Sequence, residues 1–314
     1  MEIRDFEAFV AVAEELHFGR AAARLHISQP PLSNRIRQLE HELNLPLFER
    51  STRTVTLTDA GARLLVPARR VLNEVESARN LARSIASGDQ GQVRIGFAGA
   101  SSQQALPLLT RAVRSAHPGI ELVLQSQTYV YTAFESLISG ALDLAFARLP
   151  MPHPELSSRV VEVEELMCAL PAGHPLAAKE SVQLADLVNE DFVSLPDNLG
   201  SMLQSTMYSL CVSAGFRPKI AQVAPDSSTV LALVAAGAGV TITLSSVRPV
   251  QTVGIAYRRL ENIRASHMFA TLAWLTDNPS PALHRVLDVS QVALPTPDLS
   301  AFDTDVSAIS IGST

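Results

Sequence analysis

Apolar residues recur with the spacing of an α-helix in three segments near the N-terminus. The first segment runs from Met1 to His17, and its apolar face comprises Phe6, Phe9, Val10, Ala13 and Leu16. The second segment is short, and its apolar face comprises Ala21, Ala22 and Leu25. The apolar residues of the third segment are spaced four, three and four positions apart, at Leu32, Ile36, Leu39 and Leu43. This pattern predicts three amphipathic helices that bury their apolar faces against one another.

The junction between the second and third helices has the residues of a tight turn, His26 to Ser28. Ser28 is a favourable N-cap, and Pro30 and Pro31 are tolerated in the first turn of a helix. The small alanines of the second helix let the third helix cross it closely. These features together indicate a helix-turn-helix.

A short hairpin and a long helix are predicted next. Residues 44–46 end the third helix. In residues 47–57, apolar and polar side chains alternate enough to predict a hairpin, or wing. The long helix starts after the N-cap Thr58 and runs to about Ser87, with Pro67 inside it. Its apolar positions form a heptad seam, at Ala60, Leu64, Ala68, Val71, Val75, Ala78, Ala82 and Ile85. Such a seam either covers one domain or pairs with the same helix of a second chain.

Beyond a hinge at residues 87–91, short apolar runs alternate with helical patterns. The first apolar runs, of the kind buried in parallel sheets, are residues 93–98, 122–127 and 142–147, with helices at 102–117 and 130–140. A second set comprises runs at 166–170, 192–195, 220–223 and 239–244, with helices at 201–214 and 227–236. A strand at 269–275 returns to the first set and precedes a helix from about Pro281. The pattern predicts two α/β subdomains with a ligand cleft between them.

The face of the third helix opposite its apolar stripe carries hydrogen-bonding side chains, Gln29, Ser33, Asn34, Arg37 and Gln38. We call this set the recognition face, because such side chains are suited to base edges in a major groove. Arg35, Arg50 and Arg53 flank it and are candidates for phosphate contacts. An ordinary surface helix would carry a similar face, and composition does not decide between the two interpretations.

The first sixty residues resemble the DNA-binding domain of LysR-type transcriptional regulators. The resemblance rests on four motifs, A-A-x-R-L-x-I-S-Q-P-x-L-S, I-R-x-L-E-x-E-L, L-P-L-F-E-R and L-T-x-A-G. It implies DNA contacts from Ser28, Gln29, Pro30, Ser33, Asn34, Arg35, Arg37, Arg50 and Arg53. The chain departs from the family at Asn34, where arginine is common, and at Arg35, where glutamine is common.

The resemblance also implies an assembly and a ligand. In the family the long helix is a linker that forms a homodimer, and two dimers commonly join as a homotetramer. The C-terminal half resembles the family's effector domain, which shares its architecture with periplasmic solute-binding proteins. The chain is thus expected to bind promoter DNA, to respond to a small effector, and to contact RNA polymerase if it is an activator.

Charge and composition fit a globular protein and only weakly a nucleic-acid binder. The 314 residues are 47% hydrophobic and carry a net charge of −6. Residues 20–63 nevertheless hold seven arginines against four acids, so several copies acting together are needed for useful DNA affinity. No apolar run of eighteen residues and no signal peptide is evident. With only Cys168 and Cys211, no disulfide framework is indicated, and we expect a cytoplasmic protein.

Three places in the C-terminal half have the residues of an anion site, where hydroxyl-bearing helix starts follow strand ends. They are Gly99 to Ser102, Gln125 to Thr128 and Ala224 to Ser228, and each could equally be a plain N-cap. By the resemblance, Ser101 or Ser102 and Thr128 match the positions that meet an effector carboxylate. Arg148, in A-F-A-R-L, resembles members that respond to aromatic or muconate-like acids. A surface salt bridge to a nearby acid is its alternative role, and Asp226 would repel an anion unless it caps its helix.

The sequence predicts four parts. They are a winged helix-turn-helix at 1–58, a linker helix at 59–88, an effector domain at 89–295 and a mobile tail at 296–314. The effector domain divides into about 89–161 with 267–295, and 162–266. No catalytic constellation, metal spacing or cofactor motif is present, so we expect a regulator and not an enzyme. The alternative is a two-lobed receptor or enzyme domain with an incidental DNA-binding module.

Overall fold

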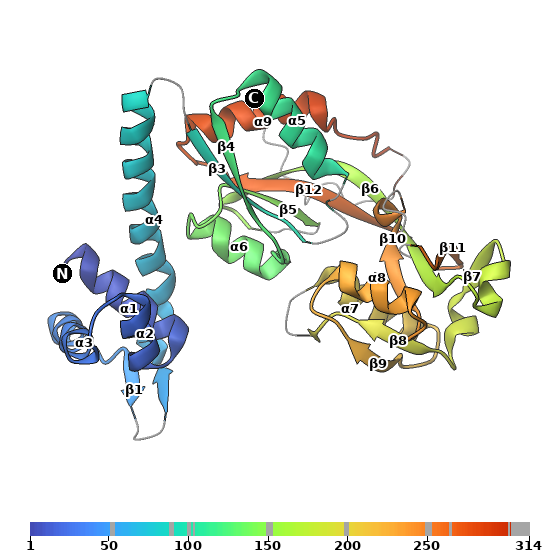
Figure 1. The fold of residues 1–314 in the computed structure, drawn as a ribbon, viewed down its shortest axis with the longest axis horizontal. Helices are drawn as coiled ribbons and strands as arrows, with labels where there is room; N and C mark the ends of the chain where they lie inside the picture. Colours follow the sequence, from blue (N-terminus) through green and yellow to red (C-terminus); the bar gives the residue numbers. More distant parts are fainter. Residues whose placement is uncertain are drawn as a thin grey trace. The chain divides into compact units, whose positions relative to one another are not determined.

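The chain forms two compact units (Figure 1), one of residues 1–89 with 138–141 and one of residues 90–137 with 142–314. The computed structural model describes residues 1–50, 54–87, 91–98, 102, 104–148, 153–197, 201–248, 253–263, 266–300 and 302. Within these residues no helix combines the length and the apolar character needed to cross a membrane. The predicted fold class, a winged helix-turn-helix followed by an α/β domain, is confirmed.

The N-terminal unit begins with three helices, α1 (Ile3–Glu15), α2 (Phe18–Arg24) and α3 (Gln29–Leu43). Their core is the predicted apolar stripes, and Phe9, Leu32 and Ile36 are completely buried. Leu16 was predicted to face this core but is 45% exposed. It is the C-cap of α1, and its left-handed conformation (φ 45°) turns the side chain away from the helix face.

Local hydrogen bonds fix the turns that position α3 and the wing. Ser28 is the N-cap residue of α3, although its side chain makes no capping hydrogen bond, and Asn44 ends the helix in the left-handed conformation. The wing pairs β1 (Phe48–Arg50) antiparallel with β2 (Val55–Leu57), as predicted. Glu40 Oε1 accepts hydrogen bonds from Leu47 N (3.0 Å) and Phe48 N (3.2 Å), and so ties the recognition helix to the wing.

The long helix α4 (Asp59–Ser87) starts at the predicted cap, where Thr58 Oγ1 accepts from Gly61 N at 3.0 Å. Its first half packs on the core of the N-terminal unit, with Ala68 fully buried. The heptad interpretation had the whole seam pairing with a second chain. Instead, the first half of the seam packs within its own chain. Part of it covers the winged domain, and Val71 is 38% exposed. The side chains of Ala82 and Ile85 and the hinge residues 88–90 lie outside the described residues.

Gly61, the glycine of the L-T-x-A-G motif, packs directly on backbone. A Cβ atom there would lie 2.2 Å from the carbonyl oxygen of Leu47 and 2.9 Å from Leu57 Cδ2. We expect Gly61→Ala to lower the free energy of unfolding by about 1–3 kcal/mol or more, because the wing must move away from α4. Urea denaturation followed by circular dichroism measures this. Gly173→Ala is the matched control, since a Cβ there meets nothing within 4 Å, and an equal loss in both variants would contradict the packing argument.

The first lobe of the C-terminal unit contains the strands β3 (Gly91–Gly96), β4 (Ile120–Gln125), β5 (Leu144–Arg148) and β12 (His267–Leu275). β3 lies between β4 and β5 and is parallel to both, whereas β12 returns antiparallel beside β5. The helices α5 (Ala105–Ala116) and α9 (Pro281–Ala293) cover one face, and α6 (Val130–Ile138) lies on the other (Figure 1). This arrangement matches the sequence prediction to within a few residues.

A long strand, β6 (Leu156–Pro171), joins the two lobes and was only partly predicted. Its first part, to Glu165, pairs with β12, and from Leu166 it pairs with β10 (Thr241–Leu244). β6 thus changes its partner strand between Glu165 and Leu166, close to the predicted subdomain boundary at about residue 161. The sequence also did not indicate β7 (Ser181–Gln183), β11 (Ile255–Glu261) and three short 3₁₀ helices, 175–178, 184–187 and 245–247.

The second lobe also contains the parallel pair β8 (Asp191–Ser194) and β9 (Lys219–Val223), with the helices α7 (Met202–Ser213) and α8 (Ser227–Ala235). Successive residues of β6 face opposite sides, so that Cys168 packs in the cluster of α7 and Ala169 in that of α8. Burial raises the pKa of the Cys168 thiol and raises that of Cys211 to about 11. Both thiols are free and buried, which leaves them protonated and poorly reactive at neutral pH.

The end of the chain lies partly within the described residues. Residues 295–300 form no helix or strand. Phe302 packs edge-on against His267 and Phe269, with ring centroids 4.9 and 5.8 Å apart, a contact that the sequence did not indicate. The rest of the predicted mobile tail, residues 301 and 303–314, lies outside the described residues.

Candidate DNA-binding face and ligand cleft

The recognition face is open to solvent on α3. Gln29, Asn34, Arg37 and Gln38 are exposed and Ser33 is half-buried, while the opposite stripe of the helix is buried. Arg37 Nη1 donates a hydrogen bond to Asn34 Oδ1 at 3.3 Å, so the two side chains lie next to each other one turn apart. A guanidinium beside a carboxamide offers donors and an acceptor together, which suits the mixed pattern of base edges in a major groove.

Arg35 and Arg37 lie two residues apart on α3 but have different surroundings. Arg35 Nη1 pairs with Asp5 Oδ1 of α1 at 3.0 Å, and its side chain is 33% exposed. Arg35 therefore joins α3 to α1 in this structure, and its contact with phosphates stays a prediction. Pro30 is exposed, and the side chain of Arg50 and all of Arg53 lie outside the described residues.

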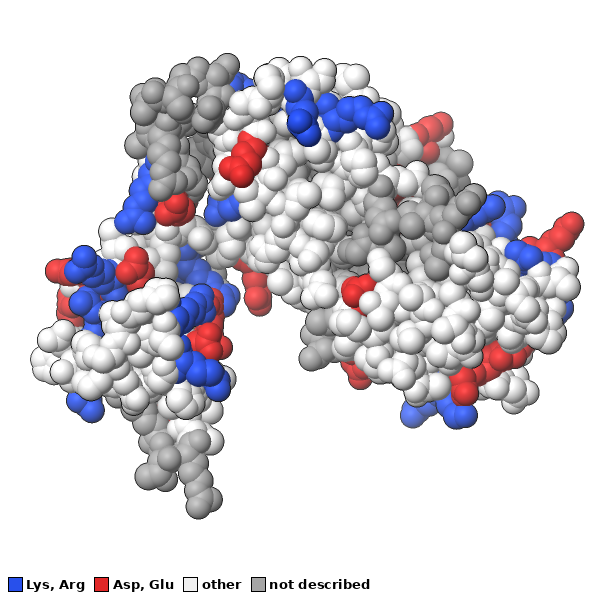
Figure 2. All heavy atoms as spheres, viewed as in Figure 1, with Lys and Arg blue, Asp and Glu red and all other residues white. Residues whose placement is uncertain are grey.

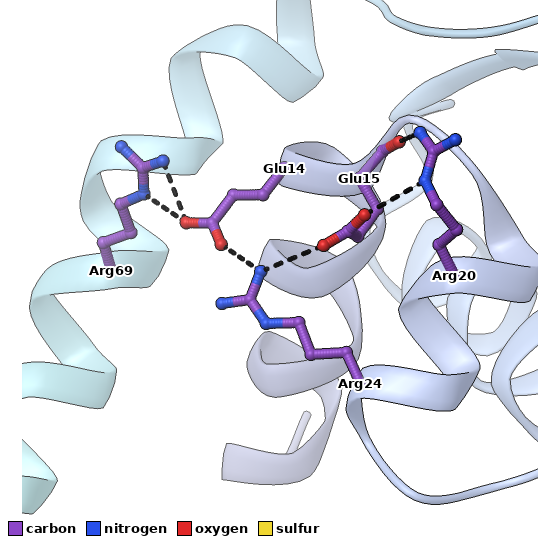
Figure 3. A network of polar contacts seen from close by, with 5 residues as sticks. All are labelled: Glu14, Glu15, Arg20, Arg24 and Arg69. Carbon is purple, nitrogen blue, oxygen red and sulfur yellow. Dashed lines mark hydrogen bonds and ion pairs between the residues drawn. The ribbon is translucent and has the colours of Figure 1, made fainter.

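Acidic partners neutralise much of the positive charge of the N-terminal unit. Figure 3 shows Glu14 between Arg24 of α2 and Arg69 of α4, at 2.5 and 2.9 Å, with Glu15 pairing with Arg20 at 3.1 Å. In Figure 2, Lys and Arg lie directly beside Asp and Glu on this unit. Among residues 20–63 whose side chains are described, ion pairs hold Arg20, Arg24, Arg35 and Arg63. These ion pairs are consistent with the prediction from the charge count that one chain attracts DNA weakly.

A cleft lies between the two lobes of the C-terminal unit and has an empty volume of about 500 Å³, part of it open to solvent. The first lobe contributes Ala98, Thr128 to Val130 and Phe146 to Arg148 to its walls. The second contributes Ser201 to Leu203, Ser227, Thr243, Leu244 and Val247. The N-termini of α6, α7 and α8 all meet here, so three positive helix ends face one cavity.

Thr128 lines the cleft, and its side chain is held in place by its contacts. Its side chain is 1% exposed, its Oγ1 donates to the Gln125 carbonyl at 3.1 Å, and its N–H donates to the Phe97 carbonyl. The methyl group occupies the space beside Gly96, where an added Cβ would lie 2.8 Å from Thr128 Cγ2. The hydroxyl is therefore held in one position at the wall of the cleft.

Arg148 is part of a buried ion pair. Its Nη2 and Nε lie 2.6 and 3.0 Å from Glu164 Oε2, and Glu164 is completely buried in the middle of β6. Ser246 Oγ donates to the other carboxylate oxygen of Glu164. Nearby, burial and the charge of Glu164 raise the pKa of Glu162 to about 6, although Arg148 acts in the opposite direction. The charge of Arg148 is thus neutralised within the fold, so the alternative of an ion pair holds, but the pair is buried and not on the surface.

The remaining predicted ligand residues have mixed positions. Asp226 caps α8, accepting hydrogen bonds from Thr229 N and Oγ1, each at 2.9 Å, which is one of the two roles that the sequence left open. Ser102 is buried and is not among the described residues that line the cleft, and Ser101 lies outside the described residues. The sequence interpretation missed Tyr129 and Ser201. Ser201 is the N-cap of α7, so the rule that selected Ser227 would also have found it.

Two family models match this chain. The family model described as "LysR substrate binding domain" matches residues 86–294, and the one described as "Bacterial regulatory helix-turn-helix protein, lysR family" matches residues 3–62. The chain is 40% identical over 293 residues to the HTH-type transcriptional regulator ShiR of Corynebacterium glutamicum, covering 92% of this chain and 98% of ShiR. It is 34% identical over 290 residues to AlsR of Bacillus subtilis, covering 92% and 95%.

Solved structures extend the likeness to whole molecules. The crystal structure of full-length CbnR complexed with its target DNA has a TM-score of 0.68 and 29% identity, and covers 93% of this chain and 100% of that one. Among the described residues of this protein, no group of three or more histidines, cysteines or acids is placed to hold a metal ion.

Proposed function

This chain belongs to the LysR family of transcriptional regulators, and we propose that it reads an inverted-repeat promoter site as a homotetramer whose geometry changes when a small organic acid binds the cleft. It is a ligand-responsive DNA-binding regulator. Within the proposal, the recognition face contacts base edges, and the linker helix α4 pairs two chains. RNA polymerase is the further partner if the outcome is activation, and no catalytic step is part of the function.

The observation that carries the acid proposal is the convergence of three helix N-termini on one cavity. The N-termini of α6 and α7 contribute the partial positive charge of a helix start, which favours a carboxylate, whereas the carboxylate of Asp226 caps α8. Thr128 supplies a hydroxyl at the start of α6, and Ser201 and Ser227 lie at the starts of α7 and α8. Because the lining comes from both lobes, a ligand favours the lobe arrangement in which it contacts both.

The test is a thermal-melt screen of the protein against aromatic, chlorinated and aliphatic carboxylates. A ligand at about 100 times its dissociation constant adds roughly 2.7 kcal/mol to the free energy of unfolding, which is readily seen. We expect Thr128→Val to remove the stabilisation by the acid that binds, because valine keeps the shape and loses the donor. Thr132→Val is the control, since Thr132 is exposed on α6. If no acid stabilises the protein, or if both variants respond alike, the carboxylate proposal is wrong.

A further inference from the structure

Tyr129 connects the two lobes across the cleft. It follows Thr128 at the start of α6 in the first lobe, and it lines the cleft. Its side chain is 6% exposed and packs in an apolar cluster that belongs almost entirely to the second lobe, including Val193, Leu195, Val230 and Leu231. These apolar contacts place the aromatic ring, and they do not require a hydroxyl group.

The hydroxyl group of Tyr129 is buried and has no hydrogen-bond partner among the described residues. Leaving a buried polar group unpaired destabilises a folded protein, and such groups are uncommon enough to call for an explanation. Burial raises the pKa of Tyr129, and the negative charge of Asp226 raises it further. The phenol therefore stays protonated at neutral pH, so that it can donate a hydrogen bond to an acceptor that the protein itself does not supply.

The surroundings restrict the charge of that acceptor. The carboxylate of Asp226 acts on Tyr129, and because both of its hydrogen-bond donors on Thr229 are neutral, capping α8 leaves its negative charge in place. A second negative charge placed beside Asp226 would be repelled, particularly where burial lowers the effective dielectric constant. A neutral oxygen, such as a hydroxyl or a ketone, avoids this repulsion and satisfies the phenol.

We propose that the Tyr129 hydroxyl is a specificity-determining donor that binds a neutral oxygen of the effector, so that the protein selects hydroxy- or keto-acids over the parent acids. The inference rests on the proposed function, in which the carboxylate lies at the helix N-termini near Thr128. The two ends of the ligand then have different requirements. One end is anionic and meets helix dipoles, and the other is neutral and meets Tyr129 at the wall of the second lobe.

Pairs of acids that differ by one oxygen function test the proposal. The pairs are benzoate with 3- and 4-hydroxybenzoate, butanoate with 3-hydroxybutanoate, and hexanoate with 5-oxohexanoate, with dissociation constants measured by calorimetry on the full chain. At least one oxygenated acid should bind about tenfold tighter than its parent, the value of one well-made hydrogen bond. Tyr129→Phe should reduce this ratio to about twofold or less, because the donor is gone. Tyr131→Phe is the matched control, since Tyr131 is 70% exposed on the same helix.

A second measurement uses the unliganded protein. Because Tyr129→Phe removes an unpaired hydroxyl, its melting temperature should equal or exceed that of the wild type. A melting temperature lower by several degrees would mean that the hydroxyl already has a partner in the folded protein, and would overturn the proposal.

The two hypotheses fail in different ways. If acids bind in a Thr128-dependent manner and Tyr129→Phe leaves every ratio unchanged, the inference is wrong and the proposed function stands. If the acids bind but Thr128→Val leaves their affinity unchanged, while Tyr129→Phe removes the preference for the oxygenated member of a pair, the carboxylate site near Thr128 is wrong and the role of Tyr129 stands. Binding of no compound in the panel overturns both.

Discussion

Replacing Glu164 with alanine is expected to lower the free energy of unfolding of the C-terminal unit by about 3–5 kcal/mol. Glu164 is completely buried, and Arg148, its partner at 2.6 Å, is 13% exposed. Removal of the carboxylate leaves a desolvated guanidinium without a counter-charge and takes away the acceptor of the Ser246 hydroxyl. Urea denaturation followed by the fluorescence of Trp274, the single tryptophan of the chain, measures the loss within this unit.

The neighbouring acid supplies the control for this experiment. Glu165 pairs with Arg259 at 3.1 Å, but Arg259 is 70% exposed, so Glu165→Ala should cost less than about 1 kcal/mol. Replacing both Glu164 and Arg148 with methionine should recover much of the loss, because no uncompensated charge remains. Equal losses for Glu164→Ala and Glu165→Ala would contradict the view that burial makes the first pair costly to break.

Local apolar patterns predicted most of the fold because apolar side chains at helix or strand spacing are the ones that the fold buries. Leu32, Ile36 and Leu39 occupy one face of α3 at helical spacing, and all three are buried. β6 was only partly predicted because the lobe crossover carries polar residues, including Arg159 and Glu164, inside a continuous strand. Their partners lie far away in the sequence, at the end of α9 and in β5, so no local pattern indicates that these positions are extended and paired.

The candidate site residues also divide into those that a local sequence pattern indicates and those whose role depends on distant partners. Hydroxyl residues at helix starts are a local signal, and through it the sequence located Thr128 and the capping role of Asp226. Arg148 could not be assigned from its own strand, because its role depends on Glu164 in a different strand. Tyr129 has an ordinary sequence context, and its importance arises from a hydroxyl left unpaired among the side chains of the other lobe. Such a feature is a property of the packed structure and not of any sequence window.

Arg37→Ala is expected to lower the preference for the cognate promoter by about 1–3 kcal/mol for each half-site, that is, by roughly 5- to 150-fold. Arg37 is exposed on the recognition face, beside Asn34, and guanidinium groups in such positions form two hydrogen bonds to guanine. Gln29→Ala and Ser33→Ala should likewise reduce preference more than total affinity. Binding to cognate and random DNA, measured by fluorescence anisotropy at several salt concentrations, separates the two quantities.

Arg35→Ala is the matched control, two residues away on the same helix with the same formal charge. Because Arg35 is paired with Asp5, its removal should change neither the preference nor the salt dependence appreciably. Arg53→Ala, by contrast, should weaken cognate and random DNA alike and reduce the salt dependence, since the wing is expected to meet phosphates. If Arg35→Ala and Arg37→Ala weakened cognate binding equally, the ion pair with Asp5 would open on DNA. The exposure of α3 in the free protein would then not identify the residues that read the sequence.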